Sequence, residues 1–135
     1  MLVFDASVVV KVLTEESGSD RAVERLTIEP DRCAPDWLSV EIASALAKKV
    51  RYAGLPPAHA TEALAALPSI LPDLVPTADL IVLALSLSIE LRHAVYDCLY
   101  LALALARGCN VLTADNKFFD AASRSQYAAR VELFA

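Results

Sequence analysis

Short apolar segments alternate with longer stretches of helical character along this chain. Residues 2–4 form a fully apolar run with Val and Phe, which favours a buried strand. Further short segments of this kind occur at about 32–34, 73–75, 110–113 and 130–134. Short apolar strands that alternate with helices indicate a parallel sheet covered on both faces.

The stretches between the expected strands carry helix start and stop signals. Ser7, Asp36 and Thr77 are suitable N-caps, and Gly54 and Gly108 are suitable helix ends. The expected helices span about 8–13, 17–26, 37–52, 56–67, 78–92, 98–107 and 116–123.

The resulting order is β-α-α-β-α-α-β-α-α-β-α-β. It predicts an α/β fold, a three-layer α/β/α domain with a small, mostly parallel central sheet. A length of 135 residues suits a single domain over the whole chain, 1–135. In such sheets, ligands bind beyond the carboxyl ends of the strands.

The apolar content raises the question of a membrane, since 56% of the residues are hydrophobic and the mean hydropathy is +0.46. The longest charge-free runs in the apolar middle, 80–89 and 98–106, are well short of the roughly 20 residues that span a bilayer. We interpret both as buried helices, and the N-terminus does not resemble a signal peptide. The three cysteines, including Cys98 in the second run, form no CxxC pair, which favours reduced thiols in a cytoplasmic protein.

The net charge of −5 and the isoelectric point of about 4.9 argue against a general nucleic-acid binder. An acidic total also suits a protein that docks a basic partner segment. The basic residues are partly gathered, and four of them are candidates for phosphate contacts: Lys11, Lys48, Lys49 and Arg51.

Four acidic residues interrupt or adjoin apolar segments: Asp5, Glu41, Asp97 and Asp115. A carboxylate beside a forming core is costly unless something neutralises it, and few cations lie near these positions. A divalent cation held by clustered carboxylates would resolve the conflict. Oxygen ligands of this kind select Mg²⁺ or Mn²⁺, and such a site can act on phosphate esters.

Two hydroxyl residues support this interpretation. Ser7 lies two residues after Asp5, and Thr113 lies two residues before Asp115. A hydroxyl so placed can orient the carboxylate or bind a water on the metal.

Each acid also has a simpler interpretation. Asp5, Asp97 and Asp115 all precede expected helices and could be N-caps. Glu41 lies inside an expected helix, so it could be a border residue with its carboxylate in water, or could pair with a lysine of the same helix.

Other catalytic motifs are absent from the sequence. It has no Cys/His set with zinc spacing and no GxxxxGK[ST], GxGxxG or GxSxG. His59 and His93 have no partners at ligand spacing, so we interpret both as structural. Asn116 and Asp120 are candidate outer members of the acidic cluster, although a solvated helix face is the simpler role for Asp120.

The stretches around the four acids resemble motifs of the PIN-domain family, specifically the VapC-type toxins of type II toxin–antitoxin pairs. The first motif is matched by LVFDASVVVKVL, with Asp5 and Ser7, and the second by PDWLSVEIASALAKKV, with Glu41. The third and fourth are matched by AVYDCLYLALALARGCNVLTADNKF, with Asp97 and Asp115. Single motifs are short, but four in the family's order, from residue 2 to about 119, are specific.

The resemblance implies a PIN fold and an Mg²⁺- or Mn²⁺-dependent endoribonuclease. It also implies a homodimer that a small cognate antitoxin protein inhibits. On this hypothesis Asp5 and Asp97 carry the principal metal, Glu41 and Asp115 complete the catalytic pocket, and a metal-activated water cleaves the RNA substrate.

Two other functions stay open at this point. In a metal-dependent phosphohydrolase, the Asp after the first strand would be a covalent nucleophile. That chemistry usually has a second Asp two residues on, where this chain has Ser7. In a non-catalytic domain that only binds a partner, the acids would bind no cation, and titration with Mn²⁺ would give no heat.

Overall fold

The computed structural model describes all 135 residues, and its strands and helices follow one another in the predicted order. The strands are β1 (Leu2–Phe4), β2 (Arg32–Pro35), β3 (Asp73–Val75), β4 (Asn110–Thr113) and β5 (Val131–Leu133). The α-helices are α1 (Ala6–Leu13), α2 (Ser19–Thr27), α3 (Leu38–Tyr52), α4 (Pro57–Ile70), α5 (Ile81–Leu91), α6 (Val95–Arg107) and α7 (Asn116–Ser123). Two short 3₁₀ turns, η1 (Thr77–Asp79) and η2 (Ala128–Arg130), precede α5 and β5.

The five strands form one parallel sheet in the order β3-β2-β1-β4-β5. Val3 of β1 is in register with Cys33 of β2 on one side and Val111 of β4 on the other. The chain therefore builds outward from β1 to β3, then returns to place β4 on the free side of β1. The change of direction between β1 and β4 is the place where open α/β sheets bind ligands.

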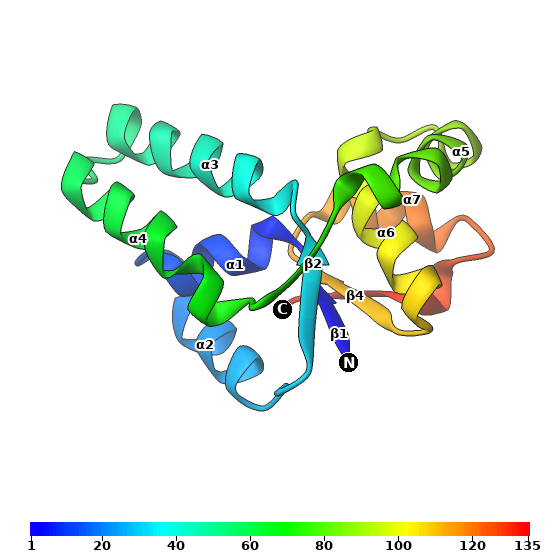
Figure 1. The fold of residues 1–135 in the computed structure, drawn as a ribbon, viewed down its shortest axis with the longest axis horizontal. Coiled ribbons are helices and arrows are strands. Elements are labelled where there is room, and N and C mark those ends of the chain that lie inside the picture. The colour runs from blue at the N-terminus through cyan, green and yellow to red at the C-terminus, as the bar shows by residue number, and fades with distance from the viewer.

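Helices cover both faces of this sheet, which confirms the predicted α/β/α layers. Figure 1 shows α1 to α4 gathered on one side of the strands and α5 to α7 on the other. The most deeply placed helix is α6, in which every residue from Cys98 to Ala104 is buried. Its apolar surface joins the strands in a core cluster of 30 buried residues.

The neighbouring helix α5 is much more exposed than its sequence predicts. Only Ala84 and Leu87 are buried, whereas Val82 is 81% exposed and Ile89 is 71% exposed. The reason is that α5 packs mainly on α6 and not on the sheet. The prediction of a buried helix is correct for residues 98–104, whereas Ala106 and most of residues 80–89 are exposed. No helix of the chain is both long and apolar enough to cross a bilayer.

Three predicted caps serve other purposes in the structure. Ser7 lies inside α1, which begins at Ala6. The Asp36 carboxylate makes no bond to α3 and instead accepts hydrogen bonds from the main-chain amide and the hydroxyl of Thr77, 41 residues away. Because Thr77 is engaged with Asp36, it starts the turn η1 and not the long helix predicted for 78–92.

Candidate metal centre

The elements bring all four acids to the carboxyl edge of the sheet. Asp5 directly follows β1, and Asp115 lies two residues after β4, the adjacent strand. Glu41 is in the first turn of α3, the helix after β2, and not in the helix interior as the sequence predicts. Because α6 leads into the start of β4, it runs from the carboxyl edge toward the amino edge, and Asp97 lies in its first turn.

Asp5 is the most buried of the four, with 3% of its surface exposed. Its Oδ2 accepts hydrogen bonds from the hydroxyls of Thr113, at 2.5 Å, and Ser7, at 2.8 Å. Burial raises the pKa of Asp5 to about 7; the two hydroxyls oppose this rise, and the charges of Asp97 and Glu41 add to it. Asp5 occupies the N-cap position of α1 but makes no side-chain cap bond, so the simple capping interpretation is wrong for it.

The hydroxyls of Ser7 and Thr113 join the ends of β1 and β4. They lie 3.3 Å apart, Ser7 Oγ accepts from the amide of Ala114, and Thr113 Oγ1 accepts from the amide of Asp115. The predicted pairing of Ser7 with Asp5 is confirmed. Thr113 was expected beside the carboxylate of Asp115, but its hydroxyl donates to Asp5 because β4 lies alongside β1.

Glu41 is half-buried and accepts a hydrogen bond at 2.7 Å from the hydroxyl of Tyr100 on α6. Burial raises the pKa of Glu41, the Tyr100 bond opposes the rise, and the charges of Asp97 and Asp115 add to it. Glu41 does not pair with a lysine of its own helix. Tyr100 could not be predicted as a partner of Glu41, because 59 residues separate the two.

Asp97 is held by His93, a contact that the interpretation of His93 as a purely structural residue did not predict. His93 Nε2 lies 2.5 Å from Asp97 Oδ2, and the imidazole stacks on Phe118 at 5.7 Å between ring centroids. His93 lies in the turn before α6, four residues before Asp97, and this short separation was the signal that could have revealed the contact. Burial raises the pKa of Asp97, and it also raises the pKa of the adjacent Cys98 thiol to about 11, which argues against a reactive cysteine.

Asp115 is the one acid for which the capping interpretation is confirmed. Its Oδ1 accepts from the amides of Lys117, at 2.9 Å, and Phe118, at 3.4 Å, at the start of α7. Asp97, in contrast, lies beyond the N-cap of α6, which is Ala94.

The four carboxylates share two properties. Each has one oxygen in hydrogen bonds, and its other oxygen accepts none: Asp5 Oδ1, Glu41 Oε2, Asp97 Oδ1 and Asp115 Oδ2. None forms an ion pair with a lysine or arginine. Free, hard oxygen atoms of carboxylates without a lysine or arginine partner are the donor set that Mg²⁺ or Mn²⁺ prefers.

The carboxylates are electrostatic neighbours without forming a closed cage. Asp5 is influenced by the charges of Asp97 and Glu41, and Asp115 acts on both of the latter. No three acidic, histidine or cysteine side chains come together closely enough to hold an ion among them. The residues therefore fit a divalent cation by chemistry and by shared position, and holding one directly would require their side chains to turn toward it.

The predicted phosphate contacts divide into two pairs. Lys11 and Lys49 both form ion pairs with Glu16, at 3.3 and 2.5 Å, so a protein carboxylate already engages both side chains. Lys48 and Arg51 are exposed and form no ion pair. Asp120 is exposed on α7, as the solvated interpretation predicts.

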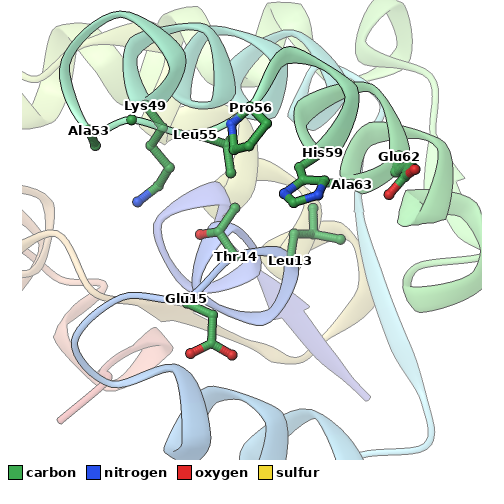
Figure 2. Close-up of a pocket in the computed structure, with 11 residues that line it drawn as sticks. Leu13, Thr14, Glu15, Lys49, Ala53, Leu55, Pro56, His59, Glu62 and Ala63 are labelled. Atoms are coloured by element: carbon green, nitrogen blue, oxygen red, sulfur yellow. The ribbon is translucent and has the colours of Figure 1, made fainter.

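A large cavity of the molecule lies away from these acids. It has a volume of about 610 Å³ and lies between the end of α1, the end of α3 and the start of α4. Figure 2 shows Lys49, His59 and Glu15 around it, from three different elements. None of the four acids lines this cavity, so chemistry and not volume identifies the candidate metal centre.

Comparison with known families identifies the domain to which these acids belong. No curated protein matches the chain. Residues 2–124 match the PIN domain family, which covers both central strands and all four acids. PIN domains are typically nucleases, and they generally use divalent metals. The fold and this match together show that the chain belongs to the PIN domain family.

Proposed function

We propose that this chain is an Mg²⁺- or Mn²⁺-dependent endoribonuclease and the toxin of a VapC-type type II toxin–antitoxin pair. The observation that carries the proposal is the set of four carboxylates at the β1/β4 edge, each with a free oxygen and none with a lysine or arginine partner. Family membership supports nuclease chemistry, and the order of the four motifs supports the toxin.

In this proposal Asp5 and Asp97 hold the principal cation, and Glu41 and Asp115 complete the site directly or through water. Ser7 and Thr113 fix Oδ2 of Asp5, which directs the remaining oxygen. When bound, the cation supplies a water of lowered pKa and neutralises charge that develops on the phosphate.

The same residues explain why the protein would need its cation to bind RNA. Bare carboxylates repel a phosphodiester, so the acids cannot approach the scissile phosphate unless their charge is neutralised. Lys48 and Arg51, which are exposed and without acidic partners, are the remaining candidates for contacts to flanking phosphates.

The test is Asp5→Asn, which keeps the size of the side chain and removes its charge. RNA cleavage with Mg²⁺ should fall by about 10³-fold or more, because losing a principal ligand removes the cation's contribution. Asp120→Asn, which changes an exposed acid on α7, is the matched control and should cleave normally. Undiminished cleavage by a folded Asp5→Asn protein would refute the assignment.

A small antitoxin is the proposed protein partner. A chain with a net charge of −5 is suited to bind a basic segment, which is one support for this partner. If a neighbouring open reading frame encodes a small DNA-binding protein, its product should copurify with this chain and abolish RNA cleavage. If that product neither binds this chain nor inhibits RNA cleavage, the toxin role is refuted and the nuclease proposal stands.

A homodimer is also part of the proposal, and the exposed side of α5 is its proposed surface. Val82, Leu85 and Ile89 recur at helical spacing there, and all three are more than half exposed. No charge interrupts residues 80–89. Two copies that each carry −5 would repel least across an uncharged apolar face, and such faces commonly mark interfaces.

Introducing lysine on that face tests the dimer. The double change Val82→Lys and Ile89→Lys should convert the dimer to a monomer in sedimentation experiments, with little change in thermal stability, since both side chains are exposed. Tyr52→Lys, at an equally exposed position on α3, is the control and should leave the dimer intact. A double variant that sediments like the wild type would exclude this face.

A further inference from the structure

Two side-chain contacts connect α3 and α6, which lie on opposite sides of the sheet (Figure 1). Trp37, at the start of α3, stacks on Tyr96 with 5.7 Å between ring centroids and 11° between ring planes. One turn further along both helices, Tyr100 donates its hydroxyl proton to Oε1 of Glu41. The two contacts are spaced by four residues on each helix and are therefore in register.

The side chains of Tyr96 and Tyr100 differ in how strongly their surroundings fix them. Tyr96 is 52% exposed, and its hydroxyl has no hydrogen-bond partner. Tyr100 is fully buried in the core, so its ring is fixed by the residues around it. Its hydroxyl is thus a fixed donor that reaches one acceptor on another element, the carboxylate of Glu41.

Glu41 needs such a donor because its side chain has three rotatable bonds. Holding a glutamate in a single arrangement costs conformational entropy. The hydrogen bond from Tyr100 opposes that cost and uses Oε1, while Oε2 accepts no bond from the protein. The contact therefore determines which oxygen of Glu41 is free.

We propose that Tyr100 is a positioning residue, which reaches across the sheet to hold Glu41 so that its second oxygen serves the cation. The inference rests on the proposed nuclease function. If Tyr100 only filled the core, phenylalanine would serve equally well, because the ring and not the hydroxyl supplies the packing.

The experiment compares Tyr100→Phe with Tyr96→Phe, which removes the same atom one turn earlier on the same helix. In Tyr100→Phe, kcat/KM for RNA and the affinity for Mn²⁺ measured by calorimetry should both fall, kcat/KM by about 10- to 100-fold, as expected for a lost bond to a charged group. Tyr96→Phe should stay within about twofold of the wild type, because its hydroxyl makes no bond.

A Glu41→Gln background separates positioning from general damage to the fold. If Tyr100 acts through Glu41, removing its hydroxyl should cost much less in that background than in the wild type. Equal losses in the two backgrounds, or wild-type activity and Mn²⁺ affinity in Tyr100→Phe, would overturn the inference.

A spectroscopic measurement keeps this inference separate from the proposed function. If the wild type cleaves no RNA, the nuclease proposal fails, and the carbon-13 resonance of the Glu41 carboxyl group decides the positioning. It should shift in Tyr100→Phe and not in Tyr96→Phe; no shift overturns the inference. Should Tyr100→Phe not fold, Glu41→Ala must shift the ζ-carbon resonance of Tyr100, and an unchanged resonance overturns it.

Discussion

Asp5 and Asp115 hold equivalent places in the fold and have opposite surroundings. Each follows one of the two adjacent strands β1 and β4 and occupies the N-cap position of the next helix. Asp5 is buried and accepts from two hydroxyls, whereas Asp115 is partly exposed and accepts from two main-chain amides of α7. The contrast teaches that neighbours from distant elements, and not position after a strand, decide how an acid is held.

The largest expected sign of this contrast is the pH dependence of stability. Burial raises the pKa of Asp5 from 3.8 to about 7, so the folded chain keeps a proton that the unfolded chain releases at much lower pH. This contribution to the free energy of unfolding is complete below about pH 4 and is lost as pH rises through about 7. At about 1.4 kcal/mol per pKa unit, the loss is up to about 4 kcal/mol.

Urea unfolding in the presence of a chelator, at about pH 5 and about pH 8, measures this loss. Asp5→Asn has no carboxyl group at this place, so the wild type should lose stability relative to that variant as pH rises. Mn²⁺ should restore the wild type at the higher pH and leave the variant unchanged. If the stability difference between the wild type and Asp5→Asn is independent of pH, burial does not raise the pKa of Asp5, and the contrast with Asp115 is refuted.

A smaller effect is expected from Thr113→Val, because Thr113 touches both acids. The variant keeps the shape of the fully buried side chain but removes the donor to Asp5 and the acceptor for the Asp115 amide. We expect the free energy of unfolding to fall by about 1–3 kcal/mol and the rate of RNA cleavage to fall by roughly 10- to 100-fold. Thr113→Ser keeps the hydroxyl and should recover most of the cleavage; if both variants cleave equally, the hydroxyl has no role.

The smallest expected effect separates the two roles of Asp115, which caps α7 and, in the proposed function, completes the metal site. Asp115→Ala removes the cap of α7 and should lower the free energy of unfolding by about 1 kcal/mol. Asp115→Asn keeps a capping oxygen and should lower it by only roughly a few tenths of a kcal/mol. Both should weaken RNA cleavage, because both remove the charge. Thermal unfolding and cleavage rates together check this; full activity in Asp115→Asn would leave Asp115 as a cap alone.

The sequence was sufficient for the order of the elements and for the edge of the sheet that the acids share. Strands such as residues 2–4 and 110–113 are short, apolar and bounded by polar residues, so local pattern determines them. The sequence was insufficient to predict the exposure of α5, because an apolar composition does not reveal which of two adjacent helices covers the sheet. The prediction that Ser7 caps α1 was wrong, because a serine before an apolar run has the same local signature whether it caps the helix or lies inside it.

Within the candidate metal centre, the acids were identifiable and most of their partners were not. An acid beside an apolar run is visible in the sequence, since its burial demands a physical reason. Tyr100 and Thr113 are ordinary members of an apolar helix and strand, and only the fold brings them to Glu41 and Asp5. The local contacts differ: Ser7 was identified beside Asp5, and His93, four residues before Asp97, could have been identified.

The pairing of β1 with β4 also has a consequence for biosynthesis. During synthesis, Asp5 leaves the ribosome 108 residues before Thr113, whose hydroxyl it binds in the folded chain. A nascent or prematurely terminated chain that lacks β4 has neither Thr113 nor Asp115, and one side of β1 has no neighbouring strand. The acidic site can therefore assemble only after β4 has been synthesised.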